Sequence, residues 1–227
     1  MSMDLGNNPN QRTPCVLVLD LSYSMRTSGD AGIIPINELN QGLQSLEDAL
    51  KSDPSAKTRV QLAIVAVGGP KGGASVLMDW TDVMEFEAFQ LKADGNTPLG
   101  EGLHLALDLI EHGKQQLKSA GISYTRPWMM VISDGEPTSS EDVWNEAVSR
   151  CLAAQDQKKV ELFSIGVAGA NLQKLGEISR KPIQTLKAVK FKELFVWISS
   201  SLSAASRSRP GENIQLDSTD PWRNVGI

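Results

Sequence analysis

Three oxygen-bearing side chains alternate directly after an apolar run near the start of the chain. Residues 15–19 are apolar, and Asp20, Ser22 and Ser24 follow in the spacing Asp-x-Ser-x-Ser. Such an uninterrupted run predicts a strand buried on both faces of a parallel sheet. Asp20 then stands at its carboxyl end, where open α/β sheets bind ligands. Carboxylate and hydroxyl oxygens that converge from one tight turn are suited to a hard divalent cation.

Two later segments supply side chains of the same kinds. Residues 128–132 form a second apolar run that leads to Asp134, followed at once by a glycine. Thr97 precedes Pro98 at the predicted start of a helix, where we expect the threonine at the cap position. Two carboxylates in a partly dry crevice repel each other, and a cation between them relieves both the repulsion and the cost of burial. We therefore predict a metal site whose ligands are Asp20, Ser22, Ser24, Thr97 and Asp134.

These five residues, in this order, match the metal-ion-dependent adhesion site (MIDAS) of von Willebrand factor type A domains. The one departure is Tyr23, which stands where the family usually has glycine between the two serines. From about Pro14 to Pro210 the chain also resembles the bacterial TerY/YegL group, which is associated with tellurite resistance. The segments that carry this second resemblance are 96–100, 124–128, 134–138 and 191–197.

The resemblance implies a Rossmann-like three-layer sandwich, with a mostly parallel central sheet, one antiparallel edge strand and helices on both faces. It implies that Ser22, Ser24 and Thr97 coordinate the metal directly or through water, and that Asp20 and Asp134 act mainly through water. An acidic residue of a protein partner would complete the coordination sphere. It further implies a role in a tellurite or other stress-response system, together with kinase and phosphatase partners.

The type of ligand indicates which metal to expect. Hydroxyls and carboxylates, without histidine or thiolate, disfavour zinc and favour magnesium, which retains waters and uses few carboxylates. Manganese and calcium are compatible with the same oxygen ligands. His104 and His112 belong to no motif, and we assign them no role.

The order of apolar segments predicts one α/β domain. After the first strand we expect strands at 59–67, 74–80, 128–133, 160–167 and 183–186, and helices at 39–50, 97–121, 140–157, 172–179 and 191–202. Strands that alternate with helices favour a mostly parallel sheet covered on both faces. The short glycine-rich connection before residue 74 predicts an antiparallel hairpin.

Composition bounds the remaining classes. The chain has 227 residues, of which 41% are hydrophobic and 22% charged, and this suits one sizeable domain. We expect the domain at 14–206, a disordered leader at 1–13 and an extended polar tail at 207–227. No apolar run approaches the ~20 residues that span a bilayer. With two cysteines we expect neither a disulfide scaffold nor a zinc site, and a cytoplasmic protein. A net charge of -5 without a basic stripe disfavours nucleic-acid binding.

Two alternatives compete with this interpretation. Aspartate and serine are common in turns, so each segment taken alone is also explained as a turn or a helix start. An aspartate at a strand end also resembles magnesium-dependent phosphotransferases and phosphatases, in which Asp20 would be the nucleophile. Those enzymes need a second carboxylate where Ser22 stands, and no general base lies in a motif beside the cluster. We therefore favour a binding module over an enzyme.

Overall fold

The computed structural model describes residues 8–27, 34–167, 169–186, 190–209 and 216. Its centre is a six-stranded sheet with the strand order β3-β2-β1-β4-β5-β6. The strands are β1 (Thr13–Leu21), β2 (Val60–Gly68), β3 (Ala74–Asp82), β4 (Trp128–Ser133), β5 (Glu161–Gly166) and β6 (Gln184–Thr185). Only the pairing of β2 with the edge strand β3 is antiparallel, as predicted from the glycine-rich connection.

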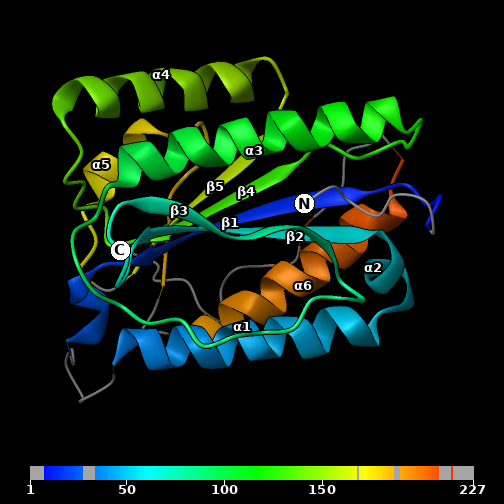
Figure 1. The fold of residues 1–227 in the computed structure, drawn as a ribbon, viewed down its shortest axis with the longest axis horizontal. Helices are drawn as coiled ribbons and strands as arrows, with labels where there is room; N and C mark the ends of the chain where they lie inside the picture. The colour runs from blue at the N-terminus through cyan, green and yellow to red at the C-terminus, as the bar shows by residue number, and fades with distance from the viewer. Residues whose placement is uncertain (1–7, 28–33, 168, 187–189, 210–215, 217–227) are drawn as a thin grey trace.

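Helices cover both faces of this sheet, so the predicted three-layer fold is confirmed (Figure 1). One face carries α3 (Leu99–Ser119), α4 (Glu141–Asp156) and α5 (Leu172–Glu177). The other carries α1 (Pro35–Ser52), α2 (Pro54–Arg59) and α6 (Phe191–Arg207), while the 3-10 turn η1 (Tyr23–Arg26) follows β1. None of the helices in these described ranges is both long enough and apolar enough to cross a membrane.

Helix α2 was not predicted, although its start has a clear local cause. Asp53 accepts hydrogen bonds from the backbone N–H groups of Ser55 and Ala56, and Pro54 occupies the first helical position. An aspartate cap followed by proline is a typical helix start. The helix escaped prediction because it has only six residues and no apolar period.

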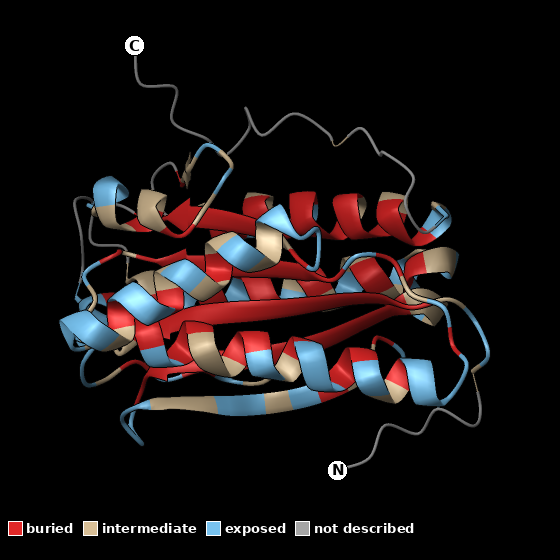
Figure 2. Cartoon of the chain, turned by 90° about the horizontal axis from the view of Figure 1, so that it is seen from above, coloured by how far each residue is buried: buried red, intermediate tan, exposed pale blue. Residues whose placement is uncertain are grey.

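The core consists of two layers separated by the sheet. Alternate residues of β1 enter different layers, with Leu17 and Leu19 on the side of α1 and α6, and Val16 and Val18 on the side of α3 and α4. All nine residues of β1 are buried (Figure 2). This strand occupies a central position in the sheet, and the segment that follows it therefore leaves from the middle of the sheet edge.

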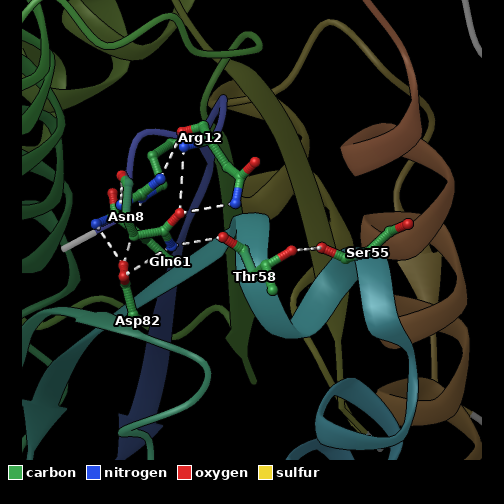
Figure 3. A network of polar contacts seen from close by, with 7 residues as sticks. Asn8, Arg12, Ser55, Thr58, Gln61 and Asp82 are labelled. Atoms are coloured by element: carbon green, nitrogen blue, oxygen red, sulfur yellow. Dashed lines mark hydrogen bonds and ion pairs between the residues drawn. The ribbon is translucent and has the colours of Figure 1, made fainter.

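A polar network connects the chain just before β1 with the start of β2 and the end of β3 (Figure 3). The Arg12 side chain is fully buried and lies 3.5 Å from Asp82, whose carboxylate also accepts from Gln61 at 2.7 Å. Asn8 donates to the carbonyl of Thr58 at 2.7 Å. Residues 1–7 of the predicted leader and most of the tail lie outside the described residues. The division into leader, domain and tail stays a prediction.

Candidate metal centre

Asp20 is the second-last residue of β1, and both of its carboxylate oxygens are held. Oδ1 accepts from the backbone N–H of Ser22 at 2.9 Å, and Oδ2 accepts from the hydroxyl of Ser133 at 2.6 Å. The residue is 1% exposed. Burial raises the pKa of Asp20, and the nearby negative charge of Asp134 raises it further, while the hydrogen bonds from Ser133 and Ser22 lower it. The site therefore holds a carboxylate whose charge is poorly compensated by the protein.

Ser133 is the contributor that sequence reasoning missed. Its hydroxyl donates to Asp20 and accepts from the backbone N–H of Gly135 at 3.0 Å, so it links two of the converging segments. The available signal was a hydroxyl residue at the end of the apolar run, directly before Asp134.

Ser22, Ser24 and Asp134 form a continuous chain of contacts. The two serine hydroxyl oxygens lie 2.9 Å apart, and the hydroxyl of Ser24 donates to Oδ2 of Asp134 at 2.6 Å. These contacts arise because β1 and β4 are parallel neighbours, which places their carboxyl ends side by side. Asp20 joins this chain of contacts through its hydrogen bond from the backbone N–H of Ser22. The structure thus brings together four of the five predicted residues, all except Thr97, through direct contacts.

The conformation of the backbone directly after β4 fixes the position of Asp134. Gly135 has φ +70°, and a β-carbon there would lie 2.8 Å from the carbonyl oxygen of Asn171. That same asparagine donates its backbone N–H to the carbonyl of Asp134 at 2.7 Å. Only glycine adopts this conformation in so little space without strain. Asp134 is consequently fixed between β4 and the start of α5.

The segment that leads to Thr97 is fastened to the end of β1. Asp94 donates its N–H to the carbonyl of Leu21 at 2.8 Å, and the carbonyl of Gly95 accepts from Tyr23 at 2.9 Å. The carbonyl of Thr97 accepts from Thr138, in the segment that follows β4, at 2.8 Å. Thr97 is 5% exposed and lies between the two segments that carry the other four predicted residues.

The predicted cap role of Thr97 is wrong. The cap residue of α3 is Pro98, which has no side-chain oxygen, and no cap hydrogen bond comes from a side chain there. Instead the hydroxyl of Ser139 accepts from the backbone N–H of Gly100 at 2.9 Å. The correction has a simple cause, because a residue 39 positions away in sequence satisfies the helix start and local pattern does not reveal it.

The donor set fits a hard cation. Within the described residues no group of three or more histidine, cysteine, aspartate or glutamate side chains could hold a metal ion. The predicted ligand set instead combines two carboxylates with serine and threonine hydroxyls, which are ligands for magnesium, manganese or calcium. A cation beside Asp20 and Asp134 would offset both the burial and the repulsion that raise the pKa of Asp20.

Comparisons with known proteins agree on the fold. The pilus adhesin SpaC from Lactobacillus rhamnosus GG, in its open conformation, is 12% identical with a TM-score of 0.66, over 87% of this chain and 31% of the adhesin. The vWF domain of the type V pili tip protein Mfa5 from Porphyromonas gingivalis is 12% identical with a TM-score of 0.58, over 90% and 99%. No curated protein sequence matches the chain.

A third similar structure is proximal thread matrix protein 1 from the mussel byssus, determined with zinc in its MIDAS motif. It is 11% identical with a TM-score of 0.53, over 86% of this chain and 49% of that protein. Identities this low establish the fold alone, and the chain spans about a third of the SpaC adhesin. The family model described as von Willebrand factor type A domain matches residues 15–195. This protein therefore belongs to the von Willebrand factor type A domain family.

Proposed function

We propose that this protein is a metal-dependent protein-interaction module that binds a divalent cation through Asp20, Ser22, Ser24, Thr97 and Asp134. The observation that carries the proposal is the contact chain from Ser22 through Ser24 to Asp134, beside the buried carboxylate of Asp20. Side-chain oxygens from two chain segments meet there, and the backbone of the segment that carries Thr97 is hydrogen-bonded to both. Family membership supports a role in protein binding rather than catalysis.

Magnesium is the metal that we propose, with manganese and calcium as substitutes. The ligands are all oxygens, and only two of them are carboxylates, which suits an ion that keeps several waters. The zinc in the MIDAS motif of the mussel protein supports the general capacity of this fold for divalent ions. A bound ion supplies a positive charge that an incoming carboxylate can approach, because neutral hydroxyls leave much of that charge uncompensated.

The partner that we propose is a protein with an acidic side chain at the contact point. The resemblance to the TerY/YegL group suggests a cytoplasmic stress-response setting, with a kinase and a phosphatase as candidate partners. Nothing in this proposal requires nucleic acid, which agrees with the net charge of -5.

A phosphotransferase reaction at Asp20 is not favoured. Both oxygens of its carboxylate accept hydrogen bonds, from Ser22 and Ser133, and the residue is 1% exposed. A nucleophile must approach the phosphorus atom directly, and both oxygens of Asp20 already accept hydrogen bonds. The role that we propose for Asp20 at the cation is mainly through water and does not need such direct access.

Calorimetric titration with magnesium tests the proposed metal site. We expect weak, reversible binding by the wild-type protein, and at least tenfold weaker binding by Ser24→Ala. The matched control is Ser45→Ala, which removes an exposed helical hydroxyl that donates only to the carbonyl of Gln41. Absence of magnesium and manganese binding to the folded wild-type protein, or equal binding by Ser24→Ala, would overturn the proposal.

A further inference from the structure

Two exposed side chains stand together directly beside the candidate metal centre. In a 3-10 turn, residues three apart in sequence lie on the same side. Tyr23 and Arg26 are the first and last residues of η1, and the Arg26 guanidinium carbon lies 5.5 Å from the centre of the Tyr23 ring. The tyrosine is 57% exposed. This pair presents a flat aromatic ring and a planar cation to the solvent.

The pair is fixed relative to the candidate ligands. Tyr23 lies between Ser22 and Ser24, whose hydroxyl oxygens are 2.9 Å apart. Its backbone N–H donates to the carbonyl of Gly95, in the segment that leads to Thr97. The backbone of Tyr23 is thus anchored between the two candidate serine ligands and the segment that leads to Thr97.

Arg26 has donors available for a partner. Its Nη1 lies 3.6 Å from Oδ1 of Asp94, and the two side chains are 52% and 50% exposed. This separation is longer than a hydrogen bond, and exposed ion pairs contribute little. In the part of the chain that the structure describes, the guanidinium makes no hydrogen bond with a side chain or a carbonyl. A carboxylate that approaches from solvent can thus engage the two-pronged edge of Arg26.

We infer that Tyr23 and Arg26 form a second recognition element, which selects partner segments with a second acidic side chain near the acid that approaches the metal. The inference rests on the proposed function and specifies the partner of that site. Arg26 binds the second carboxylate, and the Tyr23 ring packs against the apolar part of the same segment. Tyrosine and arginine dominate binding energy at protein interfaces because each combines a large contact area with specific polar geometry.

Charge gives this element its selectivity. Asp94 is hydrogen-bonded to the end of β1, and Asp134 and Glu136 follow the end of the neighbouring strand β4. A partner segment with several acids would be repelled by these carboxylates unless a cation faces each of its acids. The metal faces the first acid, and Arg26 faces the second. The distance that the two acids of the partner must span is set by the 3-10 turn, which rises about 2 Å per residue, and by the arginine side chain, which adds several ångströms. We therefore expect the two acids to be up to three residues apart in the partner.

Synthetic peptides test the inference. One series carries a single aspartate in a flexible glycine and serine background, and the other adds a glutamate one, two or three residues after it. Fluorescence anisotropy in saturating magnesium measures both. We expect at least one di-acidic peptide to bind the wild-type protein about fivefold or more tightly than the mono-acidic peptide, which is the gain expected of a two-pronged arginine contact. Arg26→Gln should abolish this gain and leave mono-acidic binding unchanged. When one serine of the di-acidic peptide is replaced by leucine, the wild-type protein should bind more tightly, and Tyr23→Ala should abolish that additional affinity.

The matched control is Arg180→Gln, since Arg180 is 54% exposed and also paired with an aspartate, Asp156. It should preserve the full gain. Equal binding of both peptide series by the wild-type protein, or an equal loss for both series in Arg26→Gln, overturns this inference alone. Peptide binding that persists in chelator, or no peptide binding in magnesium, overturns the proposed function together with it.

Discussion

The hydroxyl of Ser24 donates a 2.6 Å hydrogen bond to Asp134, although the two residues are 110 positions apart in sequence. The contact joins the turn after β1 to the segment after β4, and these strands are neighbours in the sheet. Ser24 and Asp134 are both candidate metal ligands, so the pairing of β1 with β4 directly places two residues of the proposed metal centre in contact.

Ser133 should stabilise the metal site by holding the carboxylate of Asp20 in position. Ser133→Ala removes the hydrogen bond to the buried carboxylate of Asp20 and leaves the N–H of Gly135 without its hydroxyl acceptor. We expect a loss of about 1–3 kcal/mol in the free energy of unfolding, together with about tenfold weaker magnesium binding. Chemical denaturation and calorimetric titration measure the two effects. Ser164→Ala, which changes another buried strand serine that donates to Leu175, should alter stability alone.

Substitutions at Thr97 and Ser139 should affect different properties, metal binding for Thr97 and the stability of the start of α3 for Ser139. Because Pro98 is the cap residue of α3, Thr97→Ala should change the free energy of unfolding by less than about 0.5 kcal/mol while magnesium affinity falls. Ser139→Ala removes the acceptor for the Gly100 N–H and should cost about 1 kcal/mol. A large loss of melting temperature in Thr97→Ala would instead assign that residue a structural role.

Gly68, the last residue of β2, should be required for full stability and for magnesium binding, because it lies against two segments of the candidate site. It has φ +83°, and a β-carbon there would collide with the carbonyl oxygen of Asn96 and lie 3.2 Å from the Cα of Ser22. Gly68→Ala should therefore cost about 1–3 kcal/mol and weaken magnesium binding by displacing both segments. The control is Gly72→Ala, which has a similar φ of +64° but nothing within 4 Å. Equal effects of both changes on magnesium binding would contradict this explanation.

The two cysteines should be unreactive in the folded protein. Burial raises the pKa of the Cys151 thiol to about 12, and it raises the pKa of Cys15 as well. The reactive thiolate is therefore scarce between pH 7 and 9, where an unfolded cysteine with a pKa of about 8.5 ionises. A thiol reagent should label neither residue in buffer across this range and both residues in denaturant. Rapid labelling of the folded protein that increases with pH would contradict the burial of these thiols.

The same raised pKa values give the direction of a pH effect on stability. The folded protein keeps the two thiol protons, whereas the unfolded chain loses them above about pH 8.5. Their contribution to stability is therefore fully present below that pH and declines as the pH rises. Cys151→Ala should flatten the alkaline decline in the free energy of unfolding, as measured by denaturant titration at several pH values.

Sequence alone determined the layered fold and the strand ends that carry the two carboxylates. The apolar run before Asp20 and the run before Asp134 could each be recognised locally, because a buried strand must be apolar and its first polar residue marks the end. The antiparallel hairpin at β3 was equally local, since a short connection leaves no room for a crossover.

The tertiary structure decided which atoms meet. Ser133 reaches Asp20 and Ser24 reaches Asp134 because the strand order places β1 beside β4. Ser139 replaces Thr97 at the start of α3 because the segment after β4 lies against that helix start. Hydrogen bonds between residues 39 to 113 positions apart leave no periodic trace in the sequence. Their partners are fixed by packing of the whole sheet, which sums many weak long-range contacts that no single segment specifies.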